Sequence, residues 1–277
     1  PRLDLFDSNM TLVGTPTLFI DGEWCASSDG GRRPTYNPYD ASVIMHVDEA
    51  TSNDARRAIA AAKAFFSSSD WSRRSYQDRC ELLNRMADSL QKNKAELARI
   101  ETIDTGKTLG ESEIDIDDVT NVFRFYAKEA LKLAEDKRVT GPLVPESVKS
   151  LVVHEPVGVC VLITPWNYPI LQLCWKLAPA LATGNVVIVK PSEVTPLSTI
   201  YLVHMMLEVG FPSGSIQLLT ASGASIGSVL TESPDVDLVS FTGGLQTGRS
   251  IIRSCAETVK RCTVESVSYT HLRAHET

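Results

Sequence analysis

A lysine and a glutamate three positions apart follow the apolar run of V-V-I-V-K-P-S-E, and together they could hold a sugar. Lys190 could donate to one ribose hydroxyl, and Glu193 could accept from the 2′ and 3′ hydroxyls across the Pro-Ser turn that contains Ser192. A carboxylate in that place repels a 2′-phosphate, which favours NAD over NADP. A strand-end lysine that extends its amine into water is the alternative, and the pair alone does not exclude it.

Two adjacent glycines, Gly243 and Gly244, stand at an expected strand-to-helix turn in F-T-G-G-L-Q-T-G. Glycines at such a turn let the backbone approach a pyrophosphate at the helix N-terminus. Gly223 and Gly227 form a similar but weaker pattern around the start of another expected helix. Since none of these glycines forms the G-x-G-x-x-G fingerprint, plain tight turns remain the alternative.

Polar and aromatic residues follow a third apolar run, V-C-V-L-I, in the segment T-P-W-N-Y-P. In sheets of parallel strands, the loops that leave the carboxyl ends of the strands meet at one edge, and ligands bind there. We therefore expect residues 164–168, 190–193 and 242–244 to line one crevice. Packing of the Trp166 and Tyr168 rings in the core is the alternative use of this segment.

The first half of the chain should form a hairpin and then helices. The Asp-Gly pair in L-F-I-D-G-E-W indicates the hairpin. Apolar residues at helical spacing indicate helices over about residues 51–66, 76–90, 94–104 and 111–134. Gly106 should end the third helix. The acids from Glu111 to Asp118 suit the positive end of the fourth helix, and we expect them to be solvated and not to bind a metal.

Beyond Gly141 the pattern changes, because short β-rich runs alternate with helical periodicity. Strands are expected at about residues 151–154, 157–163, 185–189, 215–219 and 236–241, and helices at about 170–181, 196–209, 224–230 and 247–255. This alternation is typical of crossover units in a parallel sheet. The fold class is therefore α/β, of a nucleotide-binding type.

Composition narrows the functional classes. The chain has 277 residues, of which 43% are hydrophobic and 22% charged, enough to bury a substantial core. A net charge of −7 without a basic run argues against a nucleic-acid partner. No apolar run approaches the roughly 20 residues that span a bilayer, and the first 25 residues lack a secretory signal. We expect a cytoplasmic protein that does not bind membranes.

The cysteines are scattered and include no C-x-x-C pair. They are Cys25, Cys80, Cys160, Cys174, Cys255 and Cys262. We expect reduced, mostly buried thiols and neither disulfides nor a zinc site. Near the end of the chain, His271 and His275 have the spacing of metal ligands, but a foreign tail explains them better.

Four blocks of sequence appear in the order and approximate spacing of the NAD(P)-dependent aldehyde dehydrogenase superfamily. They are T-P-W-N-Y-P, G-N-V-V-I-V-K-P-S-E-V-T-P, G-F-P and S-F-T-G-G. The chain resembles this family from about residue 18 to 265, and S-F-T-G-G-L-Q-T-G is most similar to its betaine aldehyde dehydrogenase branch. The resemblance implies a Rossmann-like cofactor domain, NAD as cofactor with NADP as the alternative, an aldehyde substrate and a homodimer or homotetramer.

The resemblance also implies roles for residues. In the family, a cysteine thiolate attacks the aldehyde, the thiohemiacetal gives a hydride to the nicotinamide, and a glutamate activates water. Asn167 matches the asparagine that stabilises the developing alkoxide, and Glu265 matches the general base. The implied cofactor-binding residues are Ile163, Thr164, Pro165, Trp166, Lys190, Ser192, Glu193, Gly223, Gly227, Phe241, Thr242, Gly243 and Gly244.

After Glu265 the chain departs from the family, since S-V-S-Y-T-H-L replaces L-G-G-K and no cysteine stands in a Gly-Gln-x-Cys context. We therefore expect an inactive amino-terminal fragment without the catalytic domain. The expected parts are a poorly ordered leader at 1–17, a cofactor domain at 18–265 and an artefactual tail at 266–277, with oligomerisation-arm pieces at about 18–25 and 143–158.

Two other functional classes are alternatives to an aldehyde dehydrogenase. One is a stand-alone nucleotide-binding or interaction module without catalysis. The other is a short-chain dehydrogenase, which requires a Tyr-x-x-x-Lys pair that does not occur at the right place in this sequence.

Overall fold

The structure is a computed structural model that describes residues 16–134, 137–138, 147–148 and 150–266. Among these residues, seven strands form one sheet in the order β11-β10-β7-β8-β9-β1-β2. Their bounds are β1 Leu18–Ile20, β2 Glu23–Cys25, β7 Val159–Ile163, β8 Val186–Lys190, β9 Ile216–Leu218, β10 Leu238–Gly243 and β11 Arg261–Ser266. The strands from β11 to β9 are parallel, and β1 is antiparallel to both of its neighbours. The expected α/β class with a parallel sheet is confirmed.

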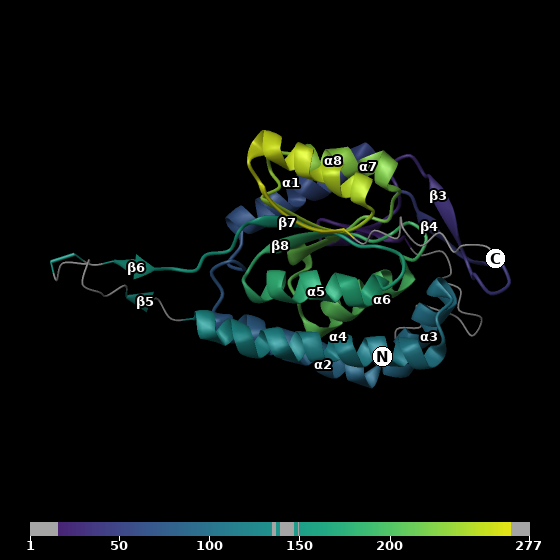
Figure 1. The fold of residues 1–277 in the computed structure, drawn as a ribbon, viewed down its shortest axis with the longest axis horizontal. Coiled ribbons are helices and arrows are strands. Elements are labelled where there is room, and N and C mark those ends of the chain that lie inside the picture. The colour runs from purple at the N-terminus through teal and green to yellow at the C-terminus, as the bar shows by residue number, and fades with distance from the viewer. Residues whose placement is uncertain (1–15, 135–136, 139–146, 149, 267–277) are drawn as a thin grey trace, which may run out of the picture.

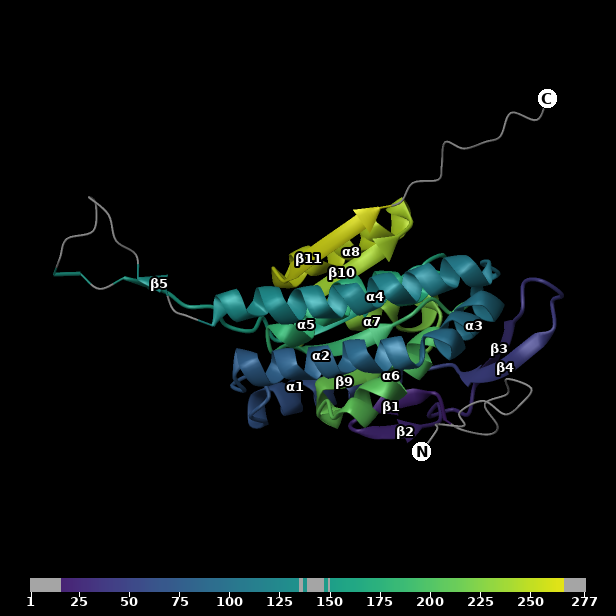
Figure 2. The same cartoon turned by 90° about the horizontal axis from the view of Figure 1, so that it is seen from below.

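Helices cover both faces of this sheet (Figure 1). On one face lie α1 (Ser52–Ser68), α7 (Gly223–Glu232) and α8 (Leu245–Thr258), and on the other lie α5 (Pro169–Ala182) and α6 (Leu197–Val209). A further layer packs on α5 and α6 and consists of α2 (Tyr76–Lys92), α3 (Lys94–Thr105) and α4 (Leu109–Ala130). Figure 2 shows α4 running along α5 beside α2.

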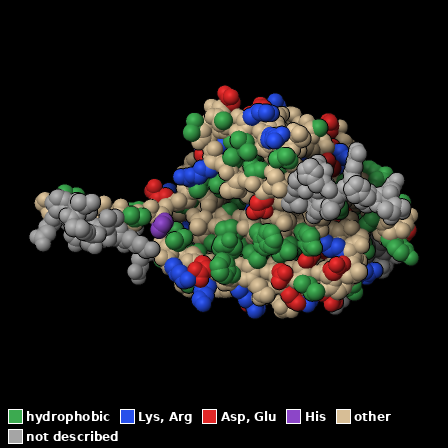
Figure 3. Space-filling model, in the orientation of Figure 1, with side chains coloured by type: hydrophobic (Ala, Val, Ile, Leu, Met, Phe, Trp, Pro, Cys, Tyr) green, Lys and Arg blue, Asp and Glu red, His purple; other side chains and the backbone are tan. Residues whose placement is uncertain are grey.

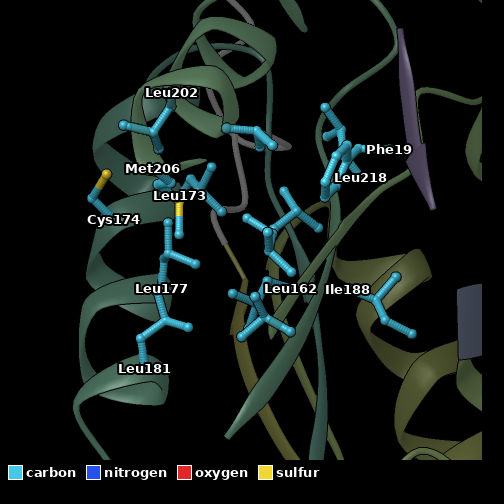
Figure 4. Packing of buried hydrophobic residues seen from close by; sticks show 14 of the residues in the cluster. Phe19, Leu162, Leu173, Cys174, Leu177, Leu181, Ile188, Leu202, Met206 and Leu218 are labelled. Carbon is cyan, nitrogen blue, oxygen red and sulfur yellow. The ribbon is translucent and has the colours of Figure 1, made fainter. Parts of the chain in front are cut away.

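The centre of the sheet is apolar on both sides. Every residue of β7 and β8 is buried, and both strands are rich in β-branched residues, as expected for parallel strands between two helical layers. Leu173 and Leu177 of α5 fill the space between this helix and the sheet, near Leu162 of β7 (Figure 4). The core therefore fixes the positions at which β7 and β8 end.

Local signals in the first half of the chain predicted its elements well. The hairpin of β1 and β2 turns at Asp21-Gly22, as expected. Thr51 caps α1 in a capping box with Asp54. Gly106 ends α3 with a left-handed φ of 79°, a conformation that costs glycine little.

The helical first half is tied to the sheet by side chains of the α1–α2 region. The indole of Trp71 donates to the carbonyl of Asn185 at 2.9 Å. The buried Arg79 donates through Nε to the carbonyl of Ala182 at 2.9 Å. Both acceptors lie around the end of α5 and the start of β8.

One expectation about α4 was wrong. The helix (Leu109–Ala130) and the 3-10 turn that continues it (Leu131–Leu133) lie close to the expected bounds, but the expected solvation of its acids fails at one residue. Asp115, which we expected to be solvated, is buried and forms an ion pair with Lys107. The reason is that Lys107, in the α3–α4 connection, covers this carboxylate and is itself mostly buried.

Two smaller sheets lie outside the main one. The strands β3 (Arg32–Tyr36) and β4 (Val43–Asp48) form a hairpin, and β5 (Lys137–Arg138) pairs with β6 (Leu151–Val152). Figure 1 shows β5 and β6 on a projection away from the body. The strand expected at 151–154 is thus only two residues long.

Several expected boundaries differ from the structure. Residues 18–25 lie in the main sheet and not beside β5 and β6. Thr17, placed in the leader, is buried and bonds to Asp48 through its N–H at 2.8 Å. Ser266, placed in the tail, is the last residue of β11 and pairs with Gly243. The rest of the leader before residue 16, the rest of the tail with His271 and His275, and much of the expected arm at 143–158 lie outside the described residues.

Two kinds of feature are absent from the described residues. No helix there is long and apolar enough to cross a membrane. No group of three or more His, Cys, Asp or Glu side chains in that part of the chain could hold a metal ion. All six cysteines are free, four of them buried and two, Cys25 and Cys262, partly exposed.

Candidate active site

The loops that follow β7, β8 and β10 lie side by side, because these three strands are neighbours and parallel. Two hydrogen bonds join the first two loops. The N–H of Thr164 donates to the carbonyl of Lys190 at 3.2 Å. The hydroxyl of Thr195 donates to the carbonyl of Trp166 at 3.2 Å. The backbone that carries Asn167 is thus held against the backbone that carries Glu193.

The β7–α5 loop presents a free amide. Asn167 is partly buried, and its side chain has no hydrogen-bond partner among the residues that the structure describes. Its neighbours Trp166 and Tyr168 are exposed to 59% and 43%, so they do not pack in the core as the alternative required. The Asn167 amide could therefore donate to an oxygen that arrives from outside.

The start of the same loop forms a wall. Ile163, the last residue of β7, is buried between Lys190 and Phe241 of the neighbouring strands. Thr164 is also buried, and its hydroxyl has no partner within the described part of the chain. Pro165 is partly buried. An unpartnered buried hydroxyl fits a place where a ligand supplies the missing hydrogen bond.

The lysine–glutamate pair at the end of β8 is present. The Lys190 amine lies 3.7 Å from Glu193 Oε2 and donates to the carbonyl of Pro191 at 3.1 Å. Burial lowers the pKa of Lys190, while Glu193 and then Glu49 raise it. Lys190 is only 3% exposed, which rules out a lysine that merely reaches water. Ser192, in the turn between the two, accepts from the N–H of Val194 at 3.5 Å.

A second carboxylate borders this pair. Glu49 accepts from Nε and Nη2 of Arg33 at 2.6 and 2.9 Å, and from the N–H of Ser222 at 2.8 Å. These bonds, the guanidinium first, lower the pKa of Glu49. Arg33 and Glu49 thus link the β3–β4 hairpin to the start of α7.

The glycines differ in the space around them. A Cβ on Gly243 would lie 2.6 Å from the ring of Phe241, so packing requires a glycine there. A Cβ on Gly244, the N-cap of α8, would meet no atom within 4 Å. The same holds for Gly223 and Gly227 of α7. Gly244 and Gly223 therefore leave backbone open to a ligand at the starts of two helices, whereas Gly227 lies within α7.

Glu265 lies across from Thr242 in the parallel pair of β11 and β10. The Thr242 hydroxyl donates to Glu265 Oε2 at 2.9 Å and accepts from the Lys176 amine at 2.7 Å. The same amine lies 3.9 Å from Glu265 Oε2. Burial lowers the pKa of Lys176, and Glu265 raises it. A carboxylate held this way, with much of its side chain exposed, could accept a proton from water.

The strand order places the candidate residues in two groups, one on each side of β8. Glu265, Thr242 and Asn167 belong to β11, β10 and the loop after β7. Gly223 and Gly227 follow β9, on the far side of β8. The candidate site is therefore an extended strip along one edge of the sheet, with Lys190 near its middle.

Comparison with known proteins decides the family. The sequence model described as the aldehyde dehydrogenase family matches residues 24–272. The chain belongs to the aldehyde dehydrogenase family. Betaine aldehyde dehydrogenase of Bacillus subtilis (strain 168) is 44% identical over 249 residues, which are 90% of this chain and 50% of that protein. Aminoaldehyde dehydrogenase 2 of Solanum lycopersicum is 41% identical over 90% of this chain and 49% of that protein.

Solved structures agree with this aldehyde dehydrogenase assignment. The structure of betaine aldehyde dehydrogenase from Staphylococcus aureus in complex with NAD+ matches with a TM-score of 0.87 and 44% identity, covering 91% of this chain and 50% of that chain. This chain spans about half the length of the curated relatives it matches.

Sequence reasoning about this aldehyde dehydrogenase chain missed Lys176, Glu49 and Arg33. A signal existed for Lys176, because it is the only charged residue in the apolar stretch P-I-L-Q-L-C-W-K-L-A-P-A-L-A. No comparable local signal marks Glu49, since its partner Ser222 is 173 residues away in the sequence.

Proposed function

We propose that this chain is the cofactor-binding part of an aldehyde dehydrogenase that oxidises an aldehyde to a carboxylic acid with NAD. One observation carries the proposal: the adjacent parallel strands β10, β7 and β8 bring Gly243-Gly244, Asn167 and the Lys190–Glu193 pair to one edge of the sheet. The NAD+ complex of the relative from Staphylococcus aureus supports the choice of cofactor.

The residues present fit NAD. Lys190 and Glu193, 3.7 Å apart, would hold the hydroxyls of the adenosine ribose. The open backbone at Gly223 and Gly244, each at the start of a helix, would hold the pyrophosphate. The orphaned Thr164 hydroxyl offers a hydrogen bond within the same strip. Bound NAD would supply the acceptor for a hydride from the substrate.

The catalytic roles that we propose use two side chains. The free Asn167 amide would donate to the oxygen that becomes negative when a nucleophile adds to the aldehyde, where one such donor is typically worth about 3–4 kcal/mol. Glu265, which accepts from Thr242 at 2.9 Å, would take a proton from the water that releases the acid. The nearby Lys176 amine would stabilise the ionised carboxylate.

We further propose that none of the six cysteines of this chain is the nucleophile. A nucleophilic cysteine needs an accessible thiolate. Burial raises the pKa of Cys160 to about 12 and that of Cys174 well above the usual value. Burial also raises the pKa of Cys25, Cys80 and Cys255. Cys262 lies on the side of β11 that faces α8, opposite to the side of Glu265. The thiol would come from the half of the relatives that this chain does not match, so the chain alone should not oxidise aldehydes.

For the substrate we propose betaine aldehyde or a related aminoaldehyde. The relatives at 44% and 41% identity carry these substrates in their names. Two aromatic residues near the start of α5 are exposed: Tyr168, the N-cap, to 43% and Trp175, within the helix, to 45%. Figure 3 shows hydrophobic side chains gathered over this helix. Aromatic faces attract quaternary ammonium groups, and because the Lys107 amine already lies 4.0 Å from the centre of the Tyr168 ring, the Trp175 ring is the one that we propose for the substrate.

The test of cofactor binding is calorimetry with NAD and this chain. We expect one binding site, lost in Lys190→Met and unchanged in Asn167→Ala, since Asn167 would contact the substrate and not the cofactor. Absence of binding by folded chain, checked by circular dichroism, would contradict the proposal. A steady rise in NADH absorbance with betaine aldehyde would contradict the proposed inactivity.

The remaining proposals concern the whole protein. We propose a homodimer or homotetramer in which β5 and β6 belong to the oligomerisation arm, supported by their place on a projection away from the body. We propose the cytoplasm as its compartment, supported by six cysteines that are all free.

A further inference from the structure

The helix α8 and the strand β11 pack through two matching faces. On α8, the buried residues Gly248, Ile251 and Cys255 lie on one side, because they are spaced by three and four positions. On β11, Cys262 and Val264 pack against the core, while Thr263 and the other alternate residues point the opposite way. A Cβ on Gly248 would lie 2.8 Å from Val264 Cγ1, so the helix and the strand are in close contact.

This packing brings two thiols together. The chain turns sharply after α8, where the N–H of Lys260 donates to the carbonyl of Cys255 at 3.2 Å, and β11 begins at the next residue. The last buried residue of the helix face, Cys255, therefore lies opposite the first residue of the strand face, Cys262. The two thiol groups lie close enough that Cys262 raises the pKa of Cys255. Both cysteines are free.

The other cysteines do not share this arrangement. Within the described part of the chain, no other cysteine shifts the pKa of Cys25, Cys80, Cys160 or Cys174. Cys255 and Cys262 are therefore neighbours because α8 packs on β11, and the number of cysteines in the chain does not by itself explain the pair.

We propose that Cys255 and Cys262 form a reversible dithiol–disulfide pair, a modification site that reacts with low-molecular-weight disulfides. Nothing in the proposed dehydrogenase function requires this site. Disulfide formation needs two Cβ atoms about 3.5–4.5 Å apart, a spacing that side chains on the facing sides of α8 and β11 can reach with small adjustments.

The two thiols have different roles in the reaction. Cys262 is partly exposed and is the thiol that a small disulfide can reach. Cys255 is 2% exposed, and burial, together with the adjacent Cys262, raises its pKa to about 11. Cys255 therefore stays protonated and reacts second, as the resolving thiol.

The chemistry balances in two exchange steps. The Cys262 thiolate attacks one sulfur of oxidised glutathione, which forms a mixed disulfide and releases one glutathione thiolate. Cys255 then loses its proton to solvent, and its sulfur attacks the Cys262 sulfur, forming the Cys255–Cys262 bond and releasing the second glutathione thiolate. The two protein thiols are oxidised by two electrons in total, and one glutathione disulfide is reduced to two thiols.

The position of the bond spares the candidate active site. Cys262 points toward α8, whereas Glu265 points to the opposite side of β11 and bonds to Thr242. Oxidation would therefore tie the helix to the strand without occupying the strip of residues proposed to hold NAD.

Peptide mass spectrometry on the wild-type chain tests the proposal. Trypsin cuts after Arg253, Lys260 and Arg261, so the two cysteines fall in separate peptides, 254–260 and 262–273. After incubation with oxidised glutathione and blocking of free thiols, we expect these peptides to be joined by a disulfide that dithiothreitol removes. Cys25, which is also partly exposed, serves as the internal control and should carry glutathione only.

Two variants separate the roles. Cys255→Ser should accumulate glutathione on Cys262, since the resolving thiol is gone, and Cys262→Ser should leave Cys255 unmodified. The proposal is overturned if wild-type protein, with Cys25 modified, shows Cys262 free or bound only to glutathione and no joined peptides. That result does not depend on whether either variant folds.

Discussion

The carboxylate of Glu265 accepts a 2.9 Å hydrogen bond from the hydroxyl of Thr242, across the two parallel strands β11 and β10. The same hydroxyl accepts from the buried amine of Lys176 at 2.7 Å. Thr242 therefore sits between a cation and an anion and fixes the position of both.

Replacing this hydroxyl should expose its contribution to stability. Thr242→Val keeps the shape of the side chain but leaves the Lys176 amine without its close acceptor. We expect a loss of about 1–3 kcal/mol in the free energy of unfolding, measured by urea denaturation. Thr263→Val is the matched control, because its hydroxyl bonds only to the neutral Ser240 hydroxyl. Equal losses in the two variants would show that the charged partners do not matter.

The ribose pair should set the preference between cofactors. In Glu193→Gln the carboxylate that repels a 2′-phosphate becomes neutral while its shape is kept. We expect the ratio of NAD to NADP affinity to fall about tenfold, which is a change of about 1.4 kcal/mol. Calorimetry with both cofactors measures it, with the exposed Glu208→Gln on α6 as control. An unchanged ratio of NAD to NADP affinity would show that Glu193 does not lie at the ribose site.

The two adjacent glycines should respond differently to one added methyl group. Gly243→Ala places a Cβ 2.6 Å from the Phe241 ring, and we expect it to lower stability by about 1–3 kcal/mol. Gly244→Ala meets no atom within 4 Å and should cost less than about 1 kcal/mol, yet its methyl occupies the space offered to a pyrophosphate. NAD affinity should therefore drop at least about tenfold in Gly244→Ala. If that variant kept its full NAD affinity, the pyrophosphate would not bind at Gly244.

Acid should weaken the fold through His204. This residue of α6 stacks on Trp24 with ring centroids 3.8 Å apart, and burial lowers its pKa to about 4. In the unfolded chain a histidine titrates near pH 6.5, so between about pH 6.5 and 4 only the unfolded state gains the proton. Stability should fall on the order of 2 kcal/mol across that window as the pH is lowered.

The variant His204→Phe tests this assignment, because it keeps the ring stack and removes the titrating group. Urea denaturation at a series of pH values should show that this part of the pH dependence disappears. Replacement of the exposed His154 should leave this part of the pH dependence unchanged. A pH profile that is the same in His204→Phe and in the wild type would assign the acid sensitivity to other groups.

Features that depend on neighbouring residues in the chain could be predicted from the sequence. The capping box of Thr51 and Asp54, the stop at Gly106 and the hairpin at Asp21-Gly22 all result from contacts within a few residues. The alternation of apolar runs and helical periodicity predicted the parallel sheet and, with it, the edge that gathers the loops. These signals placed most of the candidate residues in advance.

Features that depend on distant partners could not be predicted in this way. We expected the acids of α4 to be solvated, but Lys107 covers Asp115, which is buried. The partner of Glu49 at the start of α7 is Ser222, which only the completed fold brings close. Lys176 was visible as an isolated charge, yet its role depends on Thr242, 66 residues later.

The bonds from Trp71 and Arg79 to the carbonyls at the end of α5 and the start of β8 have a consequence for how the chain unfolds. Neither donor can keep its partner in the sheet layer if the helical layer detaches, and the loss of a buried hydrogen-bond partner is costly. Residues 16–134 and 150–266 should therefore melt in a single cooperative transition, and neither segment should fold when it is produced without the other.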